Sequence, residues 1–194
     1  MTSEAVVQPQ REDFDYDLER ALSAVVGIKA SVPADAFTAD TLGTERAGSG
    51  VIIDDSGLVL TIGYLITEAA SVWITLAGGR AVPGHVLGYD QETGFGLVQA
   101  LARMKDVPYL DLGSSKAART GERVVIAAAG GRQKAIVGRI QRDHRATSEA
   151  PQKNSGRTDV LQGRLPFAVS RFGGLFRHAS PAPNGNSPPS FSLW

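Results

Sequence analysis

The sequence contains no cysteine. This absence excludes disulfides, thiol catalysis and thiolate metal sites, but it leaves the compartment open. No apolar run approaches the roughly 18 residues that a membrane-spanning helix needs. Residues 1–30 also lack a basic stretch followed by an apolar stretch, which a secretory signal would show. We therefore expect a cytoplasmic protein with no membrane partner.

An excess of charge of one sign is also missing, because 20 basic side chains balance 20 acidic ones. No global field favours nucleic acid as a partner. The balance hides a division of the chain. Residues 1–140 hold 13 Lys and Arg against 17 Asp and Glu, whereas residues 141–194 hold 7 against 3 and carry six of the ten prolines. The chain thus joins two different kinds of sequence.

The first part of the chain has the apolar periodicity of a short helix followed by strands. A helix is predicted over residues 12–22, because Phe14, Leu18 and Leu22 recur at helical spacing and the first turn is acidic. From Ala24 onward the apolar pattern changes to that of strands. The predicted strands cover residues 24–31, 49–54, 58–62, 71–77, 82–89 and 95–101. Six short strands without a long helix between them predict a closed all-β barrel or sandwich.

Turn chemistry fixes several connections between these strands. Residues 54–57 (DDSG) and 77–80 (AGGR) predict hairpin turns, since Asp and Ser cap turns and Gly tolerates positive φ. Residues 33–47 predict an exposed loop.

A second β unit is predicted to begin after a linker. Strands are predicted at 122–128 and 134–140, with a turn at Gly130-Gly131. We expect these strands to be marginal or to recruit a partner, because a half-built barrel leaves sheet edges open. Beyond residue 140 the pattern stops, and the one further candidate strand is 165–170. We expect proteases to digest the segment beyond residue 145 faster than the core.

Five short motifs occur in the order in which a known family carries them. They are GSGVII at 48–53, GLVLT at 57–61, WITLAGGR at 73–80, GYDQET at 88–93 and LDLGSS at 110–115. Together with Gly121-Glu122, they make residues 1–140 resemble the trypsin-like serine proteases of the HtrA/Deg type. The resemblance implies two six-stranded β-barrels with the catalytic site in the cleft between them.

On this resemblance, the expected fold is all-β, a trypsin-like double β-barrel whose first barrel is complete and whose second is incomplete. The expected units are listed from the N-terminus: tail and short helix 1–23, first barrel 24–105, start of the second barrel 106–140, and an irregular basic Pro/Ser/Arg-rich tail 141–194. A PDZ-like module, which HtrA/Deg-type proteins usually carry, is not recognisable in this chain.

The sequence departs from the family at the residues that carry the chemistry. The family motif L-T-x-x-H-h-h corresponds to residues 60–66, so Tyr64 occupies the histidine position. The motif T-D-h-A-h-h corresponds to residues 93–98, so Gly94 occupies the aspartate position. The separation of 30 residues between these two positions is the one that the family shows, which indicates substitution and not misalignment.

These substitutions predict loss of the family's mechanism. A general base must take the serine proton and return it to the leaving amine, and imidazole can do both because its pKa is about 6.5. A phenol has a pKa near 10, so about one in a thousand is ionised at pH 7. Gly94 has no side chain that could orient a charged base. We therefore expect a protease homologue without an operating triad.

No other residue replaces the triad convincingly. Gly185-Asn186-Ser187 begins like the nucleophile motif G-x-S-G-G, but Pro188-Pro189 follow, and proline removes backbone donors that a following strand needs. Ser187 is thus a weak nucleophile candidate, better explained as an ordinary serine of the tail. The histidines His85, His144 and His178 are expected to be structural or solvated.

Metal and nucleotide sites are not indicated either. The chain has no metal-ligand spacing, and Gly130-Gly131 lacks the G-x-G-x-x-G pattern of a nucleotide loop. We expect no cofactor.

Three functions stay open on the sequence. The first is a non-catalytic protease homologue with a peptide- or protein-binding surface. The second is an active serine endopeptidase with an unusual site that uses Ser187 or Ser114, and the third is a structural β module of a larger assembly. The oligomeric state is left open. Size-exclusion chromatography with neighbouring gene products tests the third function.

The segment 141–194 has two interpretations. It is either a basic tail or the product of a frameshift near Ile140, and the Arg/Pro/Ser/Ala composition favours the frameshift, since an alternative frame of GC-rich DNA tends to encode it. Translating the other two reading frames beyond codon 140 tests this. If neither frame continues a β pattern that ends in a family-like Gly-Gly, the frameshift interpretation is wrong.

Overall fold

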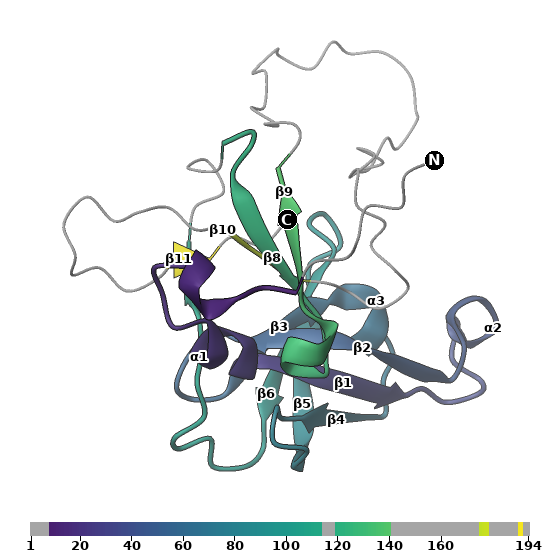
Figure 1. Ribbon diagram of the computed structural model, residues 1–194. Coiled ribbons are helices and arrows are strands. Elements are labelled where there is room, and N and C mark those ends of the chain that lie inside the picture. The colour runs from purple at the N-terminus through teal and green to yellow at the C-terminus, as the bar shows by residue number, and fades with distance from the viewer. Residues whose placement is uncertain (1–7, 114–118, 141–174, 179–189, 192–194) are drawn as a thin grey trace, which may run out of the picture.

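The first unit of the molecule is a closed β-barrel. The computed structural model describes residues 8–113, 119–140, 175–178 and 190–191, the last two segments by their backbone alone. The barrel strands are β1 (Val25–Ser31), β2 (Glu45–Ile52), β3 (Leu58–Ile62), β4 (Ser71–Thr75), β5 (Ala81–Tyr89) and β6 (Phe95–Ala100). They follow one another around the barrel in the order β1-β2-β3-β6-β5-β4, and β4 closes onto β1 (Figure 1). All neighbouring strands are antiparallel, and the closed barrel is one of the two arrangements, barrel or sandwich, that the sequence predicted.

Strand alternation builds the barrel core. On β4, Val72 and Ile74 are buried while Trp73 between them is 48% exposed. The core consists largely of aliphatic side chains that point inward in this way, among them Val26, Ile28, Ile52, Val59, Ile74 and Val98. Because branched aliphatic side chains pack well on a pleated surface, the sequence pattern and the barrel agree.

The predicted turns are confirmed. The Asp54 carboxylate accepts hydrogen bonds from the Leu58 amide at 3.0 Å and from the Ser56 hydroxyl at 2.6 Å. Gly57 completes this turn with a φ of 85°. In the β4–β5 turn, the Leu76 amide donates to the Arg80 carbonyl at 2.9 Å.

Two expectations for the first 47 residues are wrong. The predicted helix 12–22 is split into the 3-10 turn η1 (Arg11–Asp13) and the helix α1 (Leu18–Ser23). The split arises because Phe14 is extended and the Asp17 side chain caps α1 by accepting from the Arg20 amide. The expected loop 33–47 contains the short helix α2 (Ala39–Leu42), and β2 begins inside it at Glu45, since Glu45 still pairs with Ser31 of β1.

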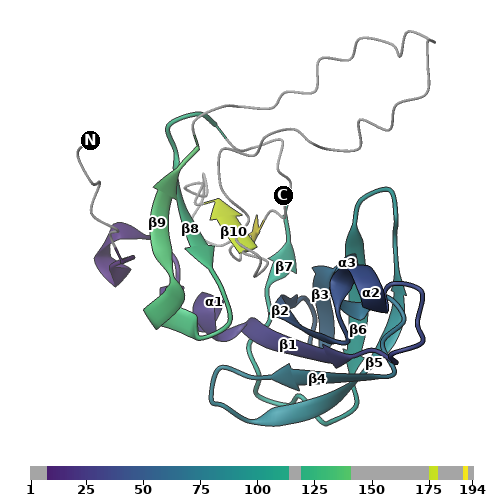
Figure 2. The same cartoon turned by 90° about the vertical axis from the view of Figure 1, so that its right-hand side faces the viewer.

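The second unit stands beside the barrel as a small sheet. It contains β7 (Asp111–Leu112), β8 (Arg123–Ala127), β9 (Ile136–Arg139), β10 (Leu175–His178) and β11 (Ser190–Phe191). These strands form one sheet in the order β10-β8-β9 and a parallel pair of β11 with β7. Figure 2 shows β8 and β9 rising from the junction where α1 meets the barrel. The described strands of this unit form no second closed barrel.

The strands of the second unit correct three further expectations. Strand 134–140 is shorter, because the 3-10 helix η3 (Gly131–Lys134) follows the turn at Gly130. β8 finds its second partner in β10 of the same chain, so residues 141–194 are not irregular throughout. β11 begins directly after Pro188-Pro189, so the prolines precede this strand and need not donate within its ladder. The candidate strand 165–170 and the expected protease-sensitive segment beyond 145 lie largely or wholly outside the described residues.

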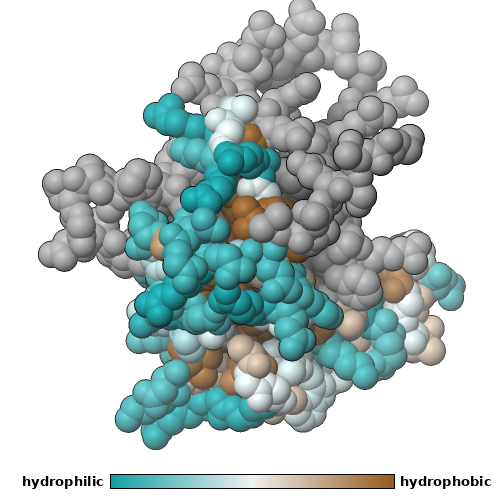
Figure 3. All heavy atoms as spheres, viewed as in Figure 1, coloured by the Kyte–Doolittle hydropathy of each residue, from teal (hydrophilic) through white to brown (hydrophobic). Residues whose placement is uncertain are grey.

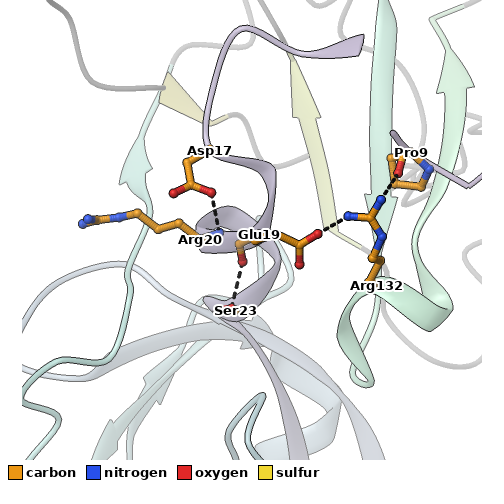
Figure 4. Close-up of polar contacts among 6 residues, drawn as sticks. All are labelled: Pro9, Asp17, Glu19, Arg20, Ser23 and Arg132. Atoms are coloured by element: carbon orange, nitrogen blue, oxygen red, sulfur yellow. Dashed lines mark hydrogen bonds and ion pairs between the residues drawn. The ribbon is translucent and has the colours of Figure 1, made fainter. Parts of the chain in front are cut away.

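The segment from Pro9 to Ser23 attaches the second unit to the barrel, and we call residues 9–23 the N-terminal clasp. Its buried Leu18 and Leu22 pack in one cluster, together with side chains of β1, β8 and the end of η3: Val25, Val125, Ala127 and Ala135. Arg132 of η3 forms an ion pair with Glu19 and donates to the Pro9 carbonyl at 3.1 Å (Figure 4). The surface over α1 and η3 is mostly hydrophilic, so the clasp covers an apolar seam with charged side chains (Figure 3).

A second ion pair joins the N-terminal clasp to β8. Arg123 donates to the Asp13 carboxylate and to the Asp13 carbonyl, both at 2.9 Å, and its guanidinium lies 5.7 Å from the centre of the Phe14 ring. The N-terminal clasp, which was predicted as one helix, therefore connects the barrel to the sheet that contains β8. Its local periodicity did not indicate this role.

Candidate functional site

The site is built around a single helical turn at the end of β3. The turn α3 (Gly63–Ile66) is anchored by Leu65 and Ile66, each 1% exposed, while Tyr64 between them and β3 is 37% exposed. Gly48 of β2 makes room for this turn, because a Cβ on Gly48 would lie 2.5 Å from Cδ1 of Leu65. The Gly-Ser-Gly motif therefore lets β2 approach the turn that presents residue 64.

The turn between β5 and β6 presents the second candidate position. The Asp90 carboxylate accepts from the Thr93 hydroxyl at 2.6 Å and from the amides of Thr93 and Glu92. These bonds, the Thr93 hydroxyl first, hold the pKa of Asp90 below its ordinary value. The Gly94 amide then donates to the Asp90 carbonyl at 2.9 Å, and Gly94 adopts a φ of 75°. Its backbone is thus one that residues with a side chain adopt rarely.

The structure brings the two candidate positions together. The Gly63 amide donates to the Gly94 carbonyl oxygen at 2.7 Å, so the residue before Tyr64 is bonded directly to Gly94. Tyr89 packs against the same spot, since a Cβ on Gly63 would lie 3.2 Å from Cβ of Tyr89. A Cβ on Gly94 would meet no atom of the described residues within 4 Å. The described part of the chain therefore leaves space where the family motif has a carboxylate side chain.

Tyr64 lies in an environment that keeps its phenol neutral. Partial burial raises the pKa of Tyr64 above its ordinary value near 10. At neutral pH the phenol can donate a hydrogen bond, but it is a poor proton acceptor.

A buried arginine that the sequence reasoning missed fixes the backbone of this turn. Arg46 on β2 is 3% exposed and donates to the Tyr64 carbonyl at 2.7 Å and to the Thr67 carbonyl at 2.9 Å. It also donates to the Gly43 carbonyl at 3.1 Å and to the Thr38 hydroxyl at 2.7 Å. Because a helix leaves its last carbonyls without partners, the guanidinium caps α3 from outside. The signal in the sequence was a lone arginine at an inward strand position.

Glu68 completes this arrangement at the end of α3. It adopts a φ of 58°, and its carboxylate accepts from the Thr38 hydroxyl at 2.5 Å and from the amides of Thr38 and Phe37. The hydrogen bonds from Thr38, followed by those from Phe37 and the charge of Arg46, lower the pKa of Glu68 although desolvation opposes them. The β1–β2 connection and α3 are therefore joined through Arg46, Thr38 and Glu68.

The remaining candidates divide into exposed and undescribed residues. His85 on β5 is exposed, as its alternation with Val86 indicated. His178 ends β10, and its side chain is outside the described part. Ser114, His144 and Ser187 lie outside the described residues altogether. Within the described residues, no group of three or more His, Cys, Asp or Glu could hold a metal ion.

Comparison with known proteins identifies the class that this barrel and site define. The family model of the trypsin-like peptidase domain matches residues 48–187, more than two thirds of the chain. The chain therefore belongs to the trypsin-like peptidase family. This confirms the family and fold class expected from the motifs.

Curated relatives are of the HtrA/Deg type, as the resemblance predicted. The chain is 36% identical over 75 residues to "Putative serine protease HhoA" of Synechocystis, covering 39% of this chain and 19% of the relative. It is 28% identical over 81 residues to "Probable periplasmic serine endoprotease DegP-like" of Hahella chejuensis, covering 42% and 17%. It is 30% identical over 79 residues to "Serine protease HTRA1" of Xenopus laevis, covering 41% and 17%. The matched stretch thus spans less than a fifth of each of these relatives.

Proposed function

We propose that this chain is a non-catalytic member of the trypsin-like peptidase family that binds a peptide or protein segment at the face carrying Tyr64. The observation that carries the proposal is the hydrogen bond of 2.7 Å between the Gly63 amide and the Gly94 carbonyl. It joins the two positions of the family's histidine and aspartate, while Tyr64 and Gly94 supply neither a base nor a carboxylate. The backbone frame of the site is kept and its proton-transfer groups are absent.

The expected loss of catalytic rate and the scarcity of the Tyr64 phenolate support this proposal. Loss of the general base alone lowers kcat by on the order of 10⁶ in a serine protease. The pKa of Tyr64 is shifted upward, which makes its phenolate still rarer at pH 7. Gly94 cannot hold an imidazole in the correct tautomer even if one were introduced.

A binding role is supported by what the site exposes. Tyr64 is 37% exposed and Tyr89, which packs against Gly63 of the same turn, is 49% exposed. Tyrosines offer a large apolar ring and a polar tip at low entropic cost, and aromatic side chains are enriched in protein interfaces. Because no atom of the described residues lies within 4 Å of a Cβ on Gly94, a partner side chain could approach the backbone at this position.

Active-site labelling and peptide binding test the two halves of this proposal. A fluorophosphonate probe, which labels activated serines, is expected to leave the protein unlabelled under conditions that label a DegP-like relative to completion. Fluorescein-labelled casein peptides are expected to bind by fluorescence anisotropy, and Tyr64→Ser and Tyr89→Ser should weaken that binding. Trp73→Ser is the matched control, because Trp73 is an equally exposed aromatic side chain on β4. Stoichiometric labelling, or binding that only Trp73→Ser weakens, contradicts the proposal.

A second candidate function is an active serine endopeptidase with a non-standard site. The family match favours it in one respect, because the match extends to residue 187, the serine of Gly185-Asn186-Ser187. The same labelling experiment decides between the two functions. If the probe labels the protein, loss of the label in Ser187→Ala or in Ser114→Ala identifies the nucleophile.

The location of the protein stays a prediction. The structure contains, among its described residues, no helix long and apolar enough to cross a membrane. A cytoplasmic location is our expectation from the sequence, whereas three relatives, among them that of Hahella chejuensis, carry the word periplasmic in their names. Cell fractionation with an antibody against this chain checks the location.

A further inference from the structure

A pocket lies at the end of the barrel opposite to Tyr64. It is lined by Asp55 and Ser56, which precede β3, and by residues 102–109, which follow β6, whereas α3 and Gly94 lie at the other ends of the same two strands. Its volume is about 740 Å³. Pockets for small organic ligands measure roughly 300–1,000 Å³, so this one is of suitable size. It is separate from the site proposed above.

The inner lining of the pocket is apolar and tightly packed. Met104 is 5% exposed and belongs to the barrel core, and Val107 and Tyr109 pack against that core while still lining the pocket. Met104 is closely backed by the β2–β3 turn, because a Cβ on Gly57 would lie 2.4 Å from Cγ of Met104. Asp106, two residues after Met104, adopts a φ of 69°, which is a strained conformation for a residue with a side chain. A strained loop over an apolar floor is an arrangement that binding sites share.

The rim of the pocket carries more positive than negative charge. Arg20, Arg103 and Lys105 line it together with the two carboxylates of Asp55 and Asp106. In the described part of the chain, no ion pair involves any of these three cations. Figure 4 shows Arg20 extending away from Glu19 and Arg132, so it takes no part in the ion pair of the N-terminal clasp. The pocket therefore offers unpaired positive charge above an apolar floor.

We propose that this pocket binds a small organic carboxylate with an apolar body, the carboxylate at the cationic rim and the body against Met104, Val107 and Tyr109. The single excess positive charge suits a monoanion, and the two carboxylates at the rim disfavour ligands of higher negative charge. The site is independent of peptide binding at Tyr64, so either proposal can fail without the other.

Decanoate and decanol provide a matched pair of probes, since they share an apolar chain and differ in charge. In a ¹⁵N-labelled sample of the whole chain, decanoate is expected to shift the amide signals of residues 55–56, 102–107 and 109 saturably. Decanol should bind about tenfold more weakly, the effect expected of a few partly screened ion pairs. The triple variant Arg20→Gln, Arg103→Gln, Lys105→Gln should lower decanoate affinity by a similar factor and leave decanol affinity unchanged.

The control for charge is a variant with cations removed elsewhere. Lys29→Gln with Arg80→Gln removes two positive charges from β1 and the β4–β5 turn and should leave decanoate binding unchanged. Equal affinity for decanol and decanoate overturns the proposal. So do signal shifts outside the pocket, an equal loss in the control variant, or the absence of saturable binding to the wild-type protein.

Discussion

The Gly63 amide donates a hydrogen bond of 2.7 Å to the carbonyl oxygen of Gly94, 31 residues further along the chain. The bond joins α3 to the β5–β6 turn through backbone groups alone. It forms where β3 ends beside the beginning of β6, because Ile62 pairs with Phe95 in the antiparallel register. The geometry of the site therefore depends on strand register and not on the side chains at 64 and 94.

Histidine at position 64 together with aspartate at position 94 should not produce proteolysis. The variant Tyr64→His, Gly94→Asp carries an imidazole and a carboxylate at the two family positions, but Gly185-Asn186-Ser187 still lacks the two glycines that follow the nucleophile in the family motif. We expect no measurable hydrolysis of fluorescent casein over many hours. Circular dichroism of the variant provides the check of folding, and measurable casein hydrolysis by a folded variant would overturn this prediction.

Gly94→Ala should destabilise the barrel by about 1 kcal/mol, since a side chain at a positive φ is strained even where space is available. Gly78→Ala is the matched control, because Gly78 also has no atom within 4 Å of an added Cβ and its φ is not positive. Urea denaturation measures both variants. An equal loss in both would show that the φ of Gly94 does not matter.

Arg46→Met should lower the free energy of unfolding by about 2 kcal/mol, because it leaves the partly buried carbonyl oxygens of Tyr64 and Thr67 without the guanidinium donor. Arg46→Lys should recover part of this loss, since one ammonium cannot reach all the partners of a planar guanidinium. Arg80→Met, at an exposed turn, should change stability by less than about 0.5 kcal/mol. Chemical denaturation distinguishes these outcomes, and a stable Arg46→Met protein would refute the capping role.

The N-terminal clasp should depend on its apolar contacts more than on its ion pairs. Leu18 is fully buried, so Leu18→Ala should cost about 3 kcal/mol. Glu19→Gln removes the exposed ion pair with Arg132 and should cost less than about 1 kcal/mol. In Leu18→Ala, the backbone amides of β8 and β9 should exchange their hydrogens faster than in the wild-type protein. The amides of β4 should exchange as slowly as before. Faster exchange spread evenly over the barrel would contradict a clasp that acts on the second unit.

Acid should weaken the β2–β3 turn through Asp54. Burial opposes ionisation of this carboxyl, but the hydrogen bonds from Ser56 and from the amides of the turn outweigh it and lower its pKa. Its stabilising effect is therefore complete above the unfolded-state pKa of about 3.9 and is lost as the pH falls through the lower folded-state value. Asp54→Asn should reduce Tm at pH 7 more than at pH 2, whereas the exposed neighbour in Asp55→Asn should give a smaller difference. Equal differences for the two variants would count against this role of Asp54.

The barrel could be predicted from the sequence because the apolar alternation and the turn residues that define its strands lie within short stretches of the chain. Strand β3 has the predicted bounds, and the other five strands of the barrel differ from prediction by a few residues at their ends. The motifs named Tyr64 and Gly94 as candidate positions, but they did not predict the hydrogen bond between the Gly63 amide and the Gly94 carbonyl. The domain boundaries and the origin of residues 141–194 stay predictions.

What could not be predicted depends on contacts between distant residues. Arg46 reaches Tyr64 and Thr67 across 18 and 21 residues, and Arg132 meets Glu19 across 113 residues. No periodicity reports such contacts, so the cap of α3 and the N-terminal clasp were missed. The split of the predicted helix was missed as well, although its causes, the extended Phe14 and the Asp17 cap of α1, are local.

Arg46 holds the turn at position 64 by carbonyl oxygens, which every amino acid possesses. Substitution of the residue at position 64 therefore leaves the hydrogen bonds from Arg46 to these carbonyl oxygens intact. A substitution at position 64 can therefore change the chemistry that this face offers to solvent while the backbone of α3 stays in place. The shape of the turn and the identity of its exposed side chain are thus set by different residues.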